Sequence, residues 1–552
     1  MATTTIDTSN IQLSSVLFTA AIAYVVYKLV TFVLAWRAYK NKLSRIPSVP
    51  APSKVLGHYE ILADARCHEY LHKLHSEIGP LHRMDLATLP IVWVTGPKHI
   101  KAILNARPAL YSRDINLRSV MREAGHGLFD AEGEEWHRLR KLTSPAFTPV
   151  MVNGMVPSMV KHTMEMRQTW SERLKAGSGK AVFTADRDFA ETAMKIFVET
   201  TFGEQMPHKV KAINGVTQEE LVEDFSVVAP EVFRRLIMLL ADWQVLRRQY
   251  VYRTPHERAI DDRTERCMKT AELILRECIK GFKENPKGTA AVDRDTRKGK
   301  DFADLFIRAN EELLSTPAGV ESFVKDFRYL LLQLIVAGFE TTASSLPAIL
   351  YYLAQHPKIH ARVQTVCDAL VDPMTGQLNA DLSDPSQLSD MTQQMQYIQH
   401  VIRESMRLRP VGPVLVFEAN TDVKIEGYDI PKGAFVGTVL YASDRRDEEL
   451  IQLNKDKNMP SLDEFEPDRW LDEELNKKLT ENFLMFGGGV RICPGRFLSM
   501  MEMQLIVTLV YGFFDLKLID KEAVVEVRKF TNRLENVKVE ITPRPQYKHL
   551  FA

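Results

Sequence analysis

The chain has 552 residues, 45% of them hydrophobic, so it is long enough to bury a large core. Its 71 basic and 71 acidic side chains cancel, which leaves no global field favouring nucleic acid or another strongly charged partner. The cysteines lack the dense spacing of a disulfide scaffold and favour a reducing compartment with mostly free thiols: Cys67, Cys267, Cys278, Cys367 and Cys493.

The first predicted element is an apolar helix over residues 13–36, about as long as the ~20 residues that cross a bilayer, and only Lys28 interrupts it. Basic residues follow it and none precedes it, so the positive-inside rule predicts a lumenal N-terminus and a cytosolic remainder. A cleaved signal peptide is the alternative, but the apolar run is too long and lacks a basic n-region. We expect residues 1–45 to form a membrane anchor with a basic flank and residues 46–552 to form one large domain.

Beyond residue 46, helix-period apolar patterns predominate, and strand-like runs, such as those at residues 90–94 and 423–436, are fewer. The expected fold class is therefore mainly α with small β-sheets. Polar, breaker-rich residues 284–301 predict a surface loop. Residues 231–250 are amphipathic, which fits either a second membrane contact or an ordinary core-facing helix.

One early pattern favours zinc chemistry. His68, Glu69 and His72 match the H-E-x-x-H motif of metallopeptidases. The longer form of that motif fails, because His75 and Ile78 stand where a glycine and the third histidine belong. An amphipathic helix near the membrane is the favoured interpretation, and zinc metallopeptidase is kept as a distant alternative.

Two further helices carry unusual polar residues. In EEWHRLRKL, Trp136 and Arg140 are four residues apart and share one helical face, a spacing that is common in amphipathic helices. In the apolar run that contains AGFETT, Gly338 weakens a helix and Glu340 is costly to bury, and Thr341 follows directly. Such a cost favours a functional role over a structural one.

Two short motifs follow in the last third of the chain. Glu404 and Arg407, in ESMR, are three residues apart and therefore share a helical face. Arg469 stands in FEPDRW further on. Either motif alone is weak, since charged pairs at this spacing are common on helix surfaces.

The most specific stretch is FGGGVRICPG, residues 486–495. Cys493 precedes a long apolar-periodic segment, so it is expected near a helix N-terminus, where free N–H groups favour a thiolate. A thiolate there is a nucleophile or a metal ligand, and no cysteine or histidine cluster nearby completes a zinc site. A single thiolate suits an axial haem ligand, with glycines giving a porphyrin room and Arg491 meeting a propionate. The alternative is a buried free cysteine in a glycine-rich turn.

This stretch resembles the haem-binding signature of the cytochrome P-450 superfamily, F-x-x-G-x-R-x-C-x-G. All five fixed positions match: Phe486, Gly489, Arg491, Cys493 and Gly495. The other motifs are similar to family motifs in the family's order, so the resemblance covers nearly the whole chain. It implies the cytochrome P-450 fold and a thiolate-ligated haem b (iron protoporphyrin IX).

The resemblance also implies roles for single residues. Cys493 is the expected axial ligand of the haem iron, and a break at Gly338 is expected to open an oxygen groove in a long helix. Proton handling is expected of Glu340 and Thr341. Cofactor-binding roles pass to the matching residues of three motifs: Trp136, Arg140, Gly338, Phe486, Gly489, Arg491 and Gly495. A buried structural network is expected of Glu404, Arg407 and Arg469.

One departure from the family concerns propionate binding. Family members commonly carry an arginine in the strand after the E-x-x-R helix, but the aligned segment GPVLVFEANTD offers Phe417 and Glu418. Propionate anchoring at that position is therefore an open question.

The resemblance implies a haem-thiolate monooxygenase that inserts one oxygen atom from O2 into a lipophilic substrate. No flavin or nicotinamide fingerprint occurs, so electrons are expected from a separate NADPH–cytochrome P-450 reductase, with cytochrome b5 as a second candidate donor. A single-pass protein of the endoplasmic reticulum membrane is expected. A haem-thiolate isomerase or dehydratase that needs no O2, and a haem protein without turnover, are the alternatives. Position within the family suggests pocket residues: Val120, Met121, Phe339, Leu415 and Phe530.

Overall fold

The computed structural model describes most of the chain: residues 26–28, 30–31, 33–87, 89–113, 127–202, 251–284, 306–308, 310–529 and 531–551, with residues 215, 217, 220–221, 223–224, 227–228, 231 and 247 between them. Several predicted features lie wholly or mostly outside these residues. They are residues 13–25 of the anchor, most of the amphipathic stretch 231–250, and loop residues 285–301.

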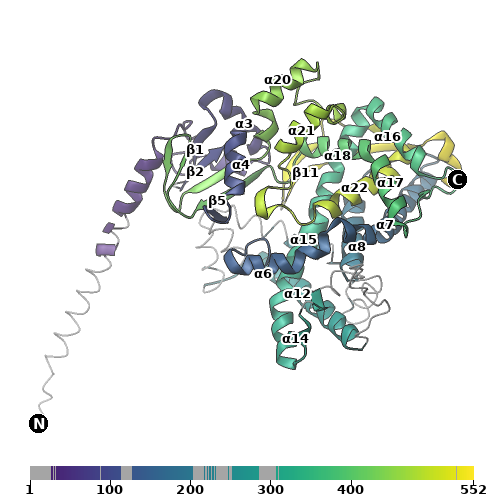
Figure 1. Cartoon of the computed structure of the whole chain (residues 1–552), viewed down its shortest axis with the longest axis horizontal. Helices are drawn as coiled ribbons and strands as arrows, with labels where there is room; N and C mark the ends of the chain where they lie inside the picture. Colours follow the sequence, from purple (N-terminus) through teal and green to yellow (C-terminus); the bar gives the residue numbers. More distant parts are fainter. Residues whose placement is uncertain are drawn as a thin grey trace, which may run out of the picture.

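Long helices form the body of the molecule around α15 (Pro317–Gln355), which runs through its centre (Figure 1). The Thr316 hydroxyl caps the first turn of α15 by accepting a hydrogen bond from the N–H of Gly319, and Pro317 occupies the first helical position. Pro357 ends the helix, since a residue before proline disfavours helical angles. The helices that pack on α15 include α8 (Asp186–Phe202), α12 (Pro255–Glu284), α18 (Gln396–Leu408) and α22 (Arg496–Leu509).

The remaining described helices cover this body. The α-helices are α2 (Tyr59–Ala63), α3 (Cys67–Ile78), α4 (Pro97–Asn105), α6 (Gly133–Thr143), α7 (Pro149–Ala176), α14 (Glu311–Leu314), α16 (Pro357–Leu370), α17 (Pro385–Gln394), α19 (Ala442–Arg445), α20 (Glu448–Asp456) and α21 (Glu473–Asn482). Short 3-10 turns are η1 (Ser144–Phe147), η2 (Pro467–Trp470), η3 (Gly489–Arg491), η4 (Tyr511–Phe513) and η5 (Pro545–Leu550).

The largest sheet joins strands from opposite ends of the sequence. Its order is β1 (Leu81–Leu86), β2 (Leu89–Val94), β8 (Phe435–Val439), β5 (Val414–Ala419) and β3 (Tyr111–Arg113). The β2–β8 pair is parallel and the other pairs are antiparallel. In Figure 1 this sheet lies beside α3 and α4 at one end of the molecule, while the C-terminus lies at the other end.

Three smaller sheets are built from the other described strands. One joins β4 (Ala181–Thr184), β12 (Lys538–Pro543) and β9 (Phe514–Leu518). The other two are hairpins, β6 (Val423–Ile425) with β7 (Tyr428–Ile430) and β10 (Val525–Arg528) with β11 (Asn532–Glu535).

The predicted class, mainly α with small β-sheets, is confirmed. The strand expected at residues 90–94 is β2, and residues 423–436 supply β6, β7 and the start of β8. Among the described residues, α15 is the helix long and apolar enough to cross a bilayer, and most of it is buried in the core. The predicted N-terminal anchor stays a prediction.

Candidate active site

Cys493 lies in a tight loop directly before α22. Its backbone N–H donates a 2.9 Å hydrogen bond to the carbonyl of Phe486, which closes the loop. Gly489 has a φ of +63°, a left-handed conformation that favours glycine. A Cβ there would lie 2.6 Å from the carbonyl oxygen of Leu104, at the end of α4. The glycines were expected to give a porphyrin room, but Gly489 is required by the close approach of α4.

The Cys493 thiol is held in a mixed electrostatic environment. Burial raises its pKa, whereas the backbone N–H of Gly495 and the guanidinium groups of Arg140 and Arg496 oppose the shift. Cys493 lies directly before α22, as expected, and the Gly495 N–H favours the thiolate, but burial outweighs this effect and leaves the pKa of the thiol raised. Metal coordination deprotonates a thiol outright, so the sulfur remains suited to binding iron.

Trp136 and Arg491 are in contact next to the Cys493 loop. Trp136, on α6, is 4% exposed, and the guanidinium carbon of Arg491 lies 4.1 Å from the centre of its ring. Arg491 also forms an ion pair with Glu132 and donates a 2.9 Å hydrogen bond to the carbonyl of Ala131. Arg140, one turn beyond Trp136, is half-buried and interacts electrostatically with Cys493. Three sequence-predicted cofactor residues thus converge beside the Cys493 loop.

The expected break in α15 at Gly338 is absent, because the helix continues through this position. Gly338 instead allows close packing: a Cβ there would lie 2.1 Å from the ring of Phe197 on α8. The expectation of a helix break is therefore wrong. The glycine has a packing function that its position beside an acidic residue did not reveal.

Glu340 and Thr341 point to different partners. The Thr341 hydroxyl donates to the carbonyl of Ala337 at 2.7 Å. Glu340 is 4% exposed, and its Oε1 accepts a 3.4 Å hydrogen bond from Thr531, whose hydroxyl also lies 2.7 Å from that of Ser344. Burial raises the pKa of Glu340, which favours its neutral, proton-carrying form.

A second polar cluster, centred on Glu404, is fully buried. Glu404 accepts two 2.9 Å hydrogen bonds from Arg407 and one of 3.1 Å from Arg469. The indole N–H of Trp470 donates to the same carboxylate at 2.9 Å. The structure thus brings together the three residues expected to form a structural network.

The expected pocket residues are placed only in part. Phe339 is fully buried in α15, and Leu415 is half-buried in β5. Val120, Met121 and Phe530 lie outside the described residues. The substrate pocket therefore stays a prediction.

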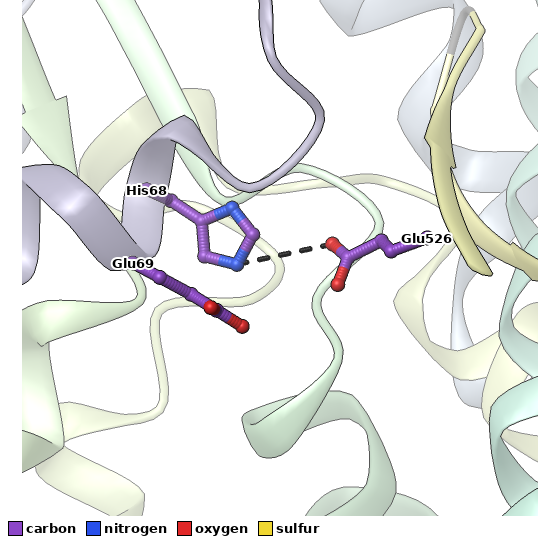
Figure 2. A group of neighbouring side chains, drawn as sticks. All are labelled: His68, Glu69 and Glu526. Carbon is purple, nitrogen blue, oxygen red and sulfur yellow. Dashed lines mark ion pairs between the residues drawn. The ribbon is translucent and has the colours of Figure 1, made fainter. Parts of the chain in front are cut away.

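The zinc alternative is not favoured by the geometry around α3. Figure 2 shows His68 pointing toward Glu526 of β10, with their nearest atoms 3.8 Å apart and Glu69 close by. Arg409 pairs with both carboxylates, at 2.9 and 3.3 Å. The other motif histidine, His72, instead accepts a 3.2 Å hydrogen bond from Arg446.

The charges around this cluster also oppose a metal ion. Burial, followed by Arg528 and Arg409, lowers the pKa of His68 to about 3. The arginines that lower this pKa would also repel a bound cation, since like charges in a buried site are costly. The motif is therefore better explained by packing: its residues lie on α3, where His68 faces Glu526 and Cys67 contacts Arg528, both of β10.

Sequence reasoning missed three polar partners of the site. They are Glu132, which pairs with Arg491; Arg107, which shares that carboxylate; and Thr531, which contacts Glu340. An acid just before the W-x-x-x-R helix was a local signal for Glu132. No local pattern marks the other two, because their partners are far away in sequence.

The family model for cytochrome P-450 matches residues 47–540, and the chain belongs to this family. Cytochrome P-450 3A9 of Rattus norvegicus is 27% identical over 444 residues, which cover 78% of this chain and 77% of the relative. Ferruginol synthase 1 of Rosmarinus officinalis is 26% identical over 507 residues, covering 89% and 92%. The crystal structure of another cytochrome P-450, CYP102L1, has a TM-score of 0.66 at 19% identity, covering 87% of this chain and 98% of that chain, and shows the same fold.

The protein is therefore a cytochrome P-450 monooxygenase, and its cofactor is thiolate-ligated haem b. The residues present fit that group. At Gly495, an added Cβ would meet only the Cys493 sulfur, at 4.0 Å, among the described atoms. Within the described part of the chain, the buried Nε of Arg491 has no hydrogen-bond partner, so it is available to an anionic group such as a propionate.

Proposed function

We propose that this chain is a single-pass membrane monooxygenase that inserts one oxygen atom from O2 into a lipophilic small molecule. Its electrons would come from NADPH–cytochrome P-450 reductase, with cytochrome b5 as a second donor. The observation that carries the proposal is the Cys493 sulfur in its closed loop, with Arg140 and Arg496 nearby. A lone thiol among cations is suited to holding haem iron.

When bound, haem b supplies the iron chemistry that activates O2. Cys493 would provide the sulfur ligand of the iron. Trp136, Arg140 and Arg491 would supply donors for the propionates, while Gly489 allows the close approach of α4 and Gly495 leaves space beside the Cys493 sulfur. The role proposed for the Glu404 network, which includes Arg407 and Arg469, is structural: it stabilises the fold and does not contact the reacting atoms.

Glu340 and Thr341, on α15, are assigned to proton transfer. Inserting one atom of O2 into the substrate leaves the other atom to become water, which takes up two electrons and two protons. A buried apolar helix supplies these protons through hydroxyls, carboxylates and ordered water. Burial raises the pKa of Glu340, which favours its protonated form, and Thr531 and Ser344 extend the chain of oxygens. These contacts support a relay that enters from the side of β11.

Residues 1–45 are proposed as the membrane anchor of an endoplasmic reticulum protein, with residues 46–552 as a cytosolic catalytic domain. Support comes from the apolar sequence and from exposed apolar side chains in the described end of the segment, including Val26, Tyr27 and Leu34. Residues 231–250 are proposed as a second membrane contact. An anchored enzyme receives apolar substrate from the bilayer, which favours a lipophilic substrate.

The experiment is to combine the full-length protein with the reductase, NADPH and a panel of lipophilic compounds in vesicles, under isotopically labelled O2. A monooxygenase transfers one labelled atom to the product and consumes NADPH in proportion. An isomerase or dehydratase gives an unlabelled product without NADPH. Deleting residues 1–36 should make the protein easier to release from membranes at high salt while haem is kept, and a deletion variant bound as firmly as the full chain would mean that the second contact at residues 231–250 outweighs the anchor.

A further inference from the structure

Phe417 occupies the position at which family members commonly carry a propionate-binding arginine. Its side chain is fully buried on β5, and Arg113 of β3 is its partner in the strand pairing. The guanidinium carbon of Arg107 lies 4.5 Å from the centre of the Phe417 ring. Arg107 therefore places a cation beside Phe417, the position at which β5 itself carries no arginine.

Arg107 is an unusual buried cation. It follows α4 by two residues, and its side chain is 3% exposed. Its ion pair is with Glu132, whose Oε1 lies 3.6 Å from Nη2, and within the described part of the chain neither its Nε nor its Nη2 has a hydrogen-bond partner. Buried donors of a charged group are almost always paired, so these two nitrogens call for a further acceptor.

The carboxylate that Arg107 uses is already shared. Glu132 also forms the ion pair with Arg491, whose side chain is 4% exposed, and accepts a 2.8 Å hydrogen bond from the backbone N–H of Arg113. Among the described residues, two buried guanidinium groups thus face one carboxylate, which leaves one positive charge unbalanced there. Burial, with Arg113 and Arg491, lowers the pKa of Arg107 to about 9, as expected for a cation short of anionic partners.

The backbone brings Arg107 to the cofactor side of the molecule. α4 ends at Asn105, and Leu104 packs on the glycines of the Cys493 loop, so close that a Cβ at Gly489 would strike its carbonyl oxygen. Arg491 follows Gly489 by two residues, just as Arg107 follows Asn105. Arg107 and Arg491 therefore both lie close to the contact between Leu104 and Gly489, and both side chains pair with Glu132.

We infer that Arg107 binds a propionate of the haem and replaces the arginine that β5 lacks at Phe417. Haem b carries two propionate carboxylates, which supply the anionic charge that Glu132 alone does not. Arg107 then donates from the nitrogens that have no partner within the described residues. This inference rests on the haem-binding site proposed above and adds one residue to it.

The test measures haem loss from full-length holoprotein to excess apomyoglobin. Arg107→Met should release haem about tenfold faster or more, because hydrogen bonds to charged groups are strong, and Arg107→Lys should lie between it and the wild type. Arg167→Met is the matched control: Arg167 is also buried, lies 4.2 Å from the centre of the Phe513 ring and donates to the carbonyl of Gly376, near the other end of α22. Its haem-loss rate should stay within about twofold of the wild type.

Two further arms separate propionate binding from a structural role. Adding Phe417→Arg to Arg107→Met should restore slow haem loss or, if the single variant takes up no haem, restore uptake. The dimethyl ester of haem, which lacks the propionate charges, should be lost equally fast from the wild type and from Arg107→Met. Equal acceleration with haem b and its ester, no acceleration with haem b, or failure of Phe417→Arg to restore retention would overturn the inference. A wild-type protein without haem would instead contradict the proposed function.

Discussion

Arg407 donates a 2.9 Å hydrogen bond to each carboxylate oxygen of Glu404, three residues before it on α18. Arg469 and Trp470, from the 3-10 turn η2, donate to the same two oxygens. Both partners of the first pair are essentially unexposed. A carboxylate so fully bonded ties α18 to η2. Its loss would remove an anionic partner from two buried arginines, of which Arg407 keeps only Asp444 and Arg469 keeps neutral acceptors such as Asn454.

Glu404→Gln should therefore lower the free energy of unfolding by about 3 to 5 kcal/mol, the usual cost of leaving a buried charge without its partner. Urea denaturation of the full-length protein measures the change. Glu77→Gln, at an exposed position near the end of α3, serves as control and should change it by less than about 0.5 kcal/mol. Equal stabilities for the two variants would show that the network does not hold the fold.

The same carboxylate should make stability depend on acid. Burial favours the protonated form of Glu404, but Arg407 and Arg469 outweigh burial and lower its pKa to about 2 from an ordinary value of 4.5. Because the folded-state pKa is the lower one, its stabilising contribution is complete above about pH 4.5 and is lost as pH falls toward 2. The difference in unfolding free energy between wild type and Glu404→Gln should shrink over this window, and a constant difference would contradict the assignment.

Gly338→Ala should destabilise the protein because the new Cβ would lie 2.1 Å from the Phe197 ring. Overpacking of this kind costs about 1 to 3 kcal/mol, and Phe197→Leu should recover part of it by making room. Gly154→Ala, in α7 with open space around the new Cβ, should be neutral or stabilising by up to about 1 kcal/mol. Thermal unfolding of the three variants compares them, and a harmless Gly338→Ala would revive the idea that the glycine serves a groove.

Thr341→Ala and Glu340→Gln should separate oxygen consumption from product formation, because each removes one proton-carrying group. Product formed per NADPH should fall about tenfold or more while peroxide release rises. Thr342→Ala is the control, because the Thr342 hydroxyl donates a hydrogen bond to the carbonyl of Gly338, four residues before it, just as Thr341 does to Ala337. All three quantities are measured in one reaction. Unchanged coupling in both test variants would indicate another proton route.

Motifs with fixed local spacing could be predicted from the sequence. The mainly α class, the strands at residues 90–94 and 423–436, and membership of the family all followed from such patterns, and the residues of the Cys493 loop and the Glu404 network lie together as expected. These predictions succeed because short-range spacing in the sequence determines which residues share a turn or a helical face.

Contacts between distant segments could not be predicted in the same way. Glu132 and Arg491 are separated by 359 positions, so no local pattern in the sequence shows that these two residues pair. The packing of Phe197 on Gly338 and of Leu104 on Gly489 likewise depends on how whole helices pack together. The sequence therefore suggests a cofactor-related role for glycines that close helix packing requires. The effect of burial on the pKa of the Cys493 thiol likewise depends on the complete tertiary structure.

The central claim is that Cys493 is the axial ligand of the haem iron. The most direct measurement is the absorption spectrum of the reduced carbon monoxide complex, recorded for wild type, Cys493→Ala and Cys278→Ala at equal haem content. Cys278 is also half-buried but lies on α12 and controls for loss of a thiol. The account predicts a thiolate-type spectrum for wild type and Cys278→Ala and its loss in Cys493→Ala. A thiolate-type spectrum that persists in Cys493→Ala would contradict the account.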